Sequence, residues 1–90
     1  MKTVLPLLGE YLGTFLLVLS VLTSTNPIFI AAVFAVILYL IVPISGAALN
    51  PALSLVYYLN GKIGWREAVI YIVVQLLAAV SSYYTYAALV

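Results

Sequence analysis

The chain has 90 residues, of which 68% are hydrophobic and only 6% are charged. An ordinary soluble domain carries charge on roughly a quarter of its residues, and a short soluble chain cannot hide so much apolar surface in one core. The composition therefore excludes a disordered tail, a coiled coil and a typical soluble domain, and it predicts an integral membrane protein in contact with the lipid bilayer. Three basic and two acidic residues form no basic patch for a nucleic-acid partner.

The residue inventory also leaves few groups for catalysis. There is no cysteine and no histidine, and the chain has only two carboxylates. Most acid–base, nucleophilic and metal-dependent chemistry needs such side chains. We therefore expect no catalytic residue, no metal site and no cofactor, and we interpret the chain as a protein that is not an enzyme.

Three runs are long enough to cross a bilayer, which takes about 20 apolar residues. They cover about residues 4–23, 28–44 and 68–90, and only Glu10 interrupts the first. The alternative, that the first run is a cleaved signal peptide, is disfavoured because Glu10 lies within the apolar stretch and no small-residue cleavage site follows. We expect a multi-pass, all-α membrane protein.

Basic residues predict how the spans are oriented. Lys2 precedes the first span, and Lys62 and Arg66 lie between the second and third. Three crossings put these residues on one side of the membrane, and basic loops favour the cytoplasm. We therefore expect a cytoplasmic N-terminus and a C-terminus on the opposite side.

The segment between the second and third spans is unusually apolar for a cytoplasmic loop. Asn50 followed by Pro51 is typical of a helix start, and the predicted helix covers about residues 51–59. Nine residues rise about 13–14 Å, roughly half of the hydrocarbon core. A surface-bound amphipathic helix is the alternative, but this helix lacks a charged face. Re-entry into the membrane is favoured, and it would point free backbone N–H groups toward the bilayer centre.

These residues resemble the first half of an aquaporin or aquaglyceroporin, in the major intrinsic protein family. The match is an ordered set spread over three spans and the half-helix: Glu10 with Gly13-Thr14, the run Ile44-Ser45-Gly46-Ala47-Ala48-Leu49-Asn50-Pro51-Ala52-Leu53-Ser54-Leu55, Gly61-Lys62-Ile63, Tyr71-Ile72 and Gln75. The resemblance implies that residues 1–90 form a single half-repeat of an inverted-repeat fold. In that fold two half-helices meet at mid-membrane.

The resemblance also implies roles for single residues. Asn50, Pro51 and Ala52 would form the pore motif, and Ile30 would occupy a filter position. Glu10 would accept hydrogen bonds from the re-entrant loop, although its place near the N-terminus also allows it to reach the interface. Gly46 would permit a tight turn. Gln75 would brace the loop, and hydrogen bonding between helices is preferred over contact with solute.

Two departures concern selectivity. Ala48 stands where the family often has histidine, and Leu53 follows Asn50-Pro51-Ala52 where the second half of family members has the filter arginine. The implied function is a half-unit of a passive channel for water or small neutral solutes. It would need a second half, either the same chain inverted or another polypeptide. The alternative is a non-conducting structural subunit of a membrane assembly.

Overall fold

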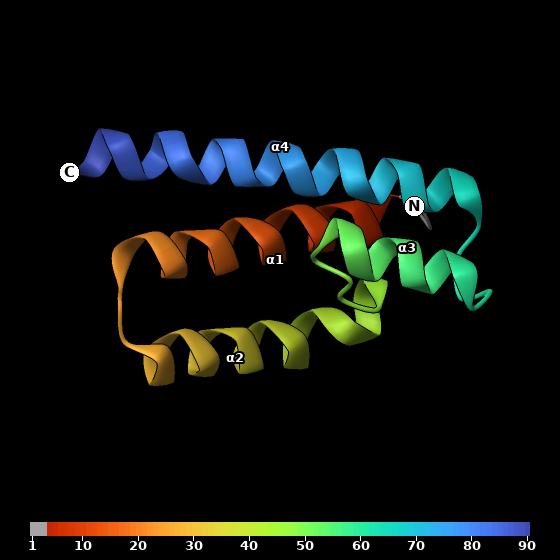
Figure 1. Cartoon of the computed structure of the whole chain (residues 1–90), viewed down its shortest axis with the longest axis horizontal. Helices are drawn as coiled ribbons and strands as arrows, with labels where there is room; N and C mark the ends of the chain where they lie inside the picture. Colours follow the sequence, from red (N-terminus) through yellow and green to blue (C-terminus); the bar gives the residue numbers. More distant parts are fainter. Residues whose placement is uncertain (1–3) are drawn as a thin grey trace.

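The computed structural model describes residues 4–90 as four helices joined by short connections. They are α1 (Val4–Thr23), α2 (Pro27–Ser45), α3 (Pro51–Leu59) and α4 (Trp65–Leu89). In Figure 1 the three long helices lie along one axis, with α1 and α4 running in the same direction and α2 running against them. Helices α1, α2 and α4 are long and apolar enough to span a bilayer. The predicted all-helical class with three spans and one half-helix is confirmed.

Small and polar residues dominate the interior of the bundle, beside the large buried side chains Ile37, Leu49 and Tyr71, and most other large apolar residues lie toward its outside. The buried side of α1 is made of Gly9, Glu10, Gly13, Thr14 and Ser20, while four leucines of the same helix are about half exposed. In lipid, helices associate through close packing and hydrogen bonds rather than through burial of large apolar side chains. The pattern is the one expected for a chain whose solvent is hydrocarbon.

One face of α4 is buried from Ala68 to Ser82. Its buried residues recur at spacings of three and four, which places them in one stripe: Ala68, Tyr71, Gln75, Ala78 and Ser82. This stripe packs against α1 and, near the start of the helix, against α3. Because Ala78 is fully buried, α1 and α4 lie close together at this level.

Two helices have ends that differ from the sequence prediction. Helix α4 begins at Trp65 instead of residue 68 and ends at Leu89. Its earlier start has a local cause: Gly64 has an extended N-cap conformation, and Glu67 accepts a hydrogen bond from the Gly64 N–H at 3.5 Å. Helix α2 is one residue longer at each end than expected, because the Asn26 side chain caps its N-terminus and Gly46 continues its last turn.

The half-helix α3 lies beside one half of α4 (Figure 1). A five-residue loop, residues 46–50, leads to it from the end of α2. Within residues 4–90, α2 packs against α1 and against neither α3 nor α4. The loop is therefore the covalent link between α2 and α3, which do not pack against each other.

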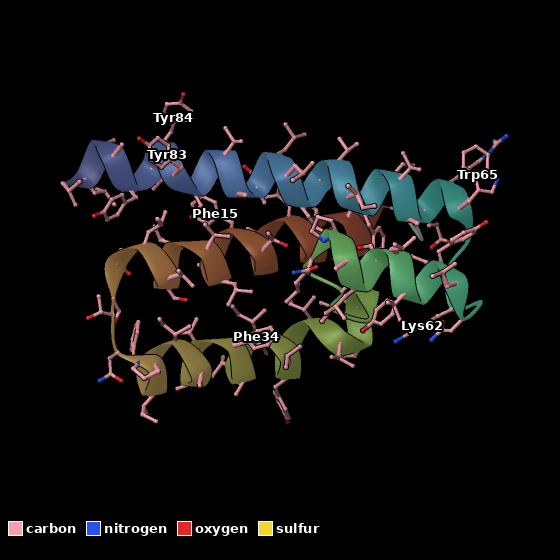
Figure 2. All side chains as sticks on the ribbon, viewed as in Figure 1. Phe15, Phe34, Lys62, Trp65, Tyr83 and Tyr84 are labelled. Carbon is pink, nitrogen blue, oxygen red and sulfur yellow. The ribbon has the colours of Figure 1, made fainter. Side chains whose placement is uncertain are left out.

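Aromatic side chains lie near both ends of α4. Figure 2 shows Trp65 at the start of the helix and Tyr83 and Tyr84 near its end. All three are exposed. Trp and Tyr are enriched where a spanning helix meets the two membrane–water interfaces, so their positions fit the length that α4 needs to cross the bilayer.

Candidate functional site: the loop before the half-helix

The backbone of the loop 46–50 adopts conformations that side chains normally avoid. Gly46 has φ 85°, while Ala47 and Leu49 have φ 51° and 56°. A non-glycine residue in this left-handed region costs roughly 1–2 kcal/mol. The loop therefore needs hydrogen bonds from its surroundings to hold it in place.

Glu10 supplies the largest share of those hydrogen bonds. Its buried carboxyl group accepts from the backbone N–H groups of Ala48 at 3.1 Å and Leu49 at 2.8 Å. It also accepts from the Ser45 hydroxyl and from Gln75 Nε2. Each carboxyl oxygen thus accepts two hydrogen bonds, so neither the carboxyl group nor these loop N–H groups is left unpaired in the interior, where an unpaired polar group is costly.

Gln75 connects the loop site to both α1 and α3. Its Nε2 donates to Glu10 Oε1 at 2.8 Å and to the Ser54 hydroxyl at 2.7 Å. Its Oε1 is buried without a hydrogen-bond partner among residues 4–90. Because the amide nitrogen faces an acceptor on each side, the orientation of the amide is fixed by its neighbours.

Three hydroxyl groups hold the carbonyl groups of the same stretch. Tyr71 donates to the Ser45 carbonyl at 3.3 Å, Tyr57 to the Gly46 carbonyl at 3.1 Å, and Thr14 to the Leu49 carbonyl at 3.3 Å. Sequence reasoning assigned no role to Tyr57 or Ser54. For Ser54, the signal was its position four residues after Asn50 in an otherwise largely apolar half-helix.

Asn50 caps α3 with its side chain. Its Oδ1 accepts from the N–H groups of Ala52 at 2.7 Å and Leu53 at 3.3 Å, and its carbonyl accepts from Ser54 N. Pro51 has no N–H to offer. The expectation of free backbone N–H groups at this helix start is therefore wrong, because Asn50 satisfies them.

The donor that remains at this helix start is the Asn50 amide nitrogen. It makes no hydrogen bond within residues 4–90, and the residue is exposed. Pro51 is half-buried and Ala52 is exposed beside it. The site thus presents one side-chain amide, held by a fixed loop, next to an apolar helix face.

Ile30 is not part of this cluster. It lies in the first turn of α2, half-buried, and its N–H donates to the Asn26 carbonyl. It precedes the last residue of α2 by about 22 Å of helix rise. The structure brings Glu10, Gly46, Asn50 and Gln75 into one region and leaves Ile30 near the other end of α2.

The sequence of the chain matches a known protein family. The family model for the major intrinsic protein matches residues 1–89. This chain belongs to the major intrinsic protein family.

One relative of this major intrinsic protein is an aquaglyceroporin, AqpS, from Rhizobium meliloti (strain 1021). The two sequences are 33% identical over 89 residues, an alignment that covers 81% of this chain and 38% of the relative. The chain therefore spans about two fifths of the length of the relative that it matches. No solved structure matches the chain. Family membership together with three apolar helices makes this an integral membrane protein.

Proposed function

We propose that this chain is a half-unit of a passive channel for water or small neutral solutes, completed by a second half. The observation that carries the proposal is the exposed Asn50 amide at the start of α3, in a loop whose conformation Glu10 holds. An amide N–H donates a hydrogen bond, which the oxygen of water or of a neutral hydroxyl compound can accept. No acid, base or metal is needed for passive transport.

The length of α3 and its contact with α4 support a position of Asn50 near the middle of the bilayer. Helix α3 has nine residues, so it rises about 13–14 Å, while the hydrocarbon core measures about 30 Å. Ser54, one turn after Asn50, contacts Gln75, which lies in the eleventh position of the 25-residue α4. If Leu59 lies near one interface, Asn50 lies close to the midplane.

The exposed side of α3 supports the need for a second half. Leu53, Leu55, Val56 and Leu59 are between 42% and 71% exposed. Ala47, Ala48 and Leu49 of the loop are already buried within this chain, but Asn50 is exposed, and a polar group at membrane depth needs protein or water around it. A second half would cover this side of α3 and complete the wall around Asn50. In this arrangement we propose that Pro51 and Ala52 border the solute path and that Ile30 lines a constriction toward the other end of α2.

Stopped-flow swelling of proteoliposomes that contain only this chain tests the proposal for an inverted homodimer. We expect water permeability above that of empty liposomes and a loss of the increase with Asn50→Leu. Tyr39→Leu, at an 84% exposed position, is the control and should conduct normally. Circular dichroism confirms that each variant is helical. Permeability equal to that of empty liposomes excludes a homomeric channel, and the assay is then repeated with a second half that carries its own Asn-Pro-Ala motif.

A non-conducting structural subunit is the second candidate, and Leu53 favours it. The position after Asn50-Pro51-Ala52 holds an apolar side chain instead of a cation, so the chain brings no fixed charge to a filter at this position. Failure to conduct both alone and with a second half would support this candidate over the channel.

A further inference from the structure

Lys62 lies at the beginning of the loop that leads to Asn50, although it follows α3 in the sequence. The turn after α3 places it there: Gly61 has φ 82°, and the Lys62 N–H donates to the Tyr57 carbonyl at 2.8 Å. The Lys62 ammonium nitrogen is 4.1 Å from the centre of the Tyr57 ring. In Figure 2 the labelled Lys62 lies in the space between α3 and the end of α2.

The end of the Lys62 side chain lies next to Gly46, the first residue of the loop. A Cβ atom added to Gly46 would lie 3.4 Å from both Lys62 Cε and Lys62 Nζ. The Tyr57 hydroxyl donates to the Gly46 carbonyl at 3.1 Å. Tyr57 thus holds the first residue of the loop with its hydroxyl and the lysine with its ring, where a cation is attracted by the π-electrons.

Neither carboxylate of the chain lies in this contact. The sequence has two acidic residues: Glu10 is fully buried and accepts four hydrogen bonds, and Glu67 reaches back to Gly64 N. The other nearby cation, Arg66, lies over the Trp65 ring at 5.2 Å. Lys62 is therefore a positive charge held against the start of the loop without an acidic partner within residues 4–90.

We propose that Lys62 is a selectivity residue that repels cations and attracts anions at the Gly46 end of the loop 46–50, with Tyr57 as the residue that positions it. The proposal rests on the proposed function, because it gives this charge a solute path to act on. It assigns the exclusion of cations at the Gly46 end of the loop to Lys62, which lies outside the Asn50-Pro51-Ala52 motif. A charge acts on its surroundings over about 10 Å at 0.1 M salt, which is enough to reach one turn along α3 from Tyr57.

A single introduced thiol can measure this charge without measuring conduction. The chain has no cysteine, so Leu53→Cys gives one reporter. Leu53 is 42% exposed and lies four residues before Tyr57, on the same side of α3. Its reaction rates with an anionic, a cationic and a neutral methanethiosulfonate of similar size are compared in detergent-solubilised protein. The ratio of the anionic to the cationic rate reports the local potential.

We expect Lys62→Gln to lower this ratio about threefold or more at low salt, and the effect to shrink as salt is added. Lys62→Arg should retain the ratio, and Arg66→Gln is the matched control that removes a charge from the same end without changing the ratio. Tyr57→Leu should lower the ratio while Lys62 is still present, because it frees the lysine from its position.

The outcomes separate this inference from the function on which it rests. If the neutral reagent reacts and Lys62→Gln leaves the ratio unchanged, the charge role of Lys62 is overturned and the channel proposal stands. If the neutral reagent does not react with any variant, water does not reach position 53 and the charge of Lys62 has no solute to act on there. That outcome overturns the inference, while the channel proposal is decided separately by the swelling assay. An equal fall with Arg66→Gln also overturns the inference, because it shows a general effect of net charge.

Discussion

Gln75 and Glu10 are joined by a 2.8 Å hydrogen bond between Nε2 and Oε1, and their relative exposures are only 1% and 0%. The same Gln75 nitrogen donates to Ser54 at 2.7 Å, and the same Glu10 carboxyl group holds the loop at Ala48 and Leu49. The pair therefore connects α1, α3, α4 and the loop through one buried point. Stability and the geometry of Asn50 should both depend on it.

Replacing Glu10 by Gln should destabilise the fold strongly. The new amide offers one acceptor oxygen and an NH2 group that faces existing donors, so several buried groups lose their partners. We expect a loss of about 2–4 kcal/mol in unfolding free energy, measured by denaturant titration in detergent micelles. Glu67→Gln, at an exposed position, serves as the control and should change the unfolding free energy by less than about 0.5 kcal/mol. An equally small effect of Glu10→Gln would contradict the role given to the carboxyl group.

Replacing Gln75 by Leu should loosen α3 more than it disturbs α1. The change removes the donor to both Ser54 and Glu10, and we expect a cost of about 1–3 kcal/mol. Hydrogen exchange should rise in Pro51–Leu59 and in the loop. Ser54→Ala should cost less, and the Gln75/Ser54 double variant should fall short of the sum of the two single changes, because both remove the same hydrogen bond. Simple additivity would show that the two side chains act independently.

Gly46→Ala tests the conformation at the start of the loop. Gly46 has φ 85°, which an alanine adopts at a cost of about 1–2 kcal/mol. Gly64→Ala is a matched control, since Gly64 has φ −76° and a Cβ there meets nothing closer than 3.9 Å. Thermal unfolding of the two variants in the same detergent should show the larger loss at position 46. Equal losses would indicate that left-handed geometry is not what this position requires.

Asn50→Asp should change selectivity without removing the helix cap. Aspartate keeps the oxygen that accepts from Ala52 and Leu53, so α3 should form as before. The substitution replaces the exposed Asn50 amide nitrogen by a carboxylate oxygen, and the negative charge of the carboxylate attracts cations. In conducting proteoliposomes, potassium flux should increase relative to water permeability. A variant that carries water and cations in the original ratio would show that the Asn50 side chain does not face the solute path.

Orientation can be checked by labelling from each side of sealed vesicles. With cysteine introduced singly at Lys62 or Val90, a membrane-impermeant reagent should reach the two positions from opposite sides, with the Lys62 side cytoplasmic. An antiparallel homodimer requires both orientations in the same preparation. A single orientation would exclude that dimer and leave a second half of different sequence.

Much of the fold follows from local features of the sequence. Runs of about 20 apolar residues predict the three long helices, and Asn50 followed by Pro51 predicts the start of α3. Helix α4 starts earlier than its apolar run predicts, because Glu67 extends the helix through a side-chain contact with Gly64. Such contacts depend on side-chain geometry, and apolar periodicity does not record them.

The candidate site was harder to predict than the helices. The resemblance to a family singled out Glu10, Gly46, Asn50 and Gln75, but not Ser54 or Tyr57, whose partners lie 21 and 11 residues away in the chain. The prediction of free N–H groups at the start of α3 was wrong, because the orientation of the Asn50 side-chain amide decides whether these N–H groups are hydrogen-bonded. Helix periodicity indicates which residues share a face, and not which distant groups pair.

The position of Gln75 also has a consequence for the order of synthesis. Glu10 belongs to α1, which leaves the ribosome before the rest of the bundle, and its partner Gln75 follows 65 residues later on α4. Until α4 is made, Ser54 has no Gln75 to contact and α3 has no helix to pack against. We therefore expect the insertion of α3 to be completed only after α4 has entered the bilayer.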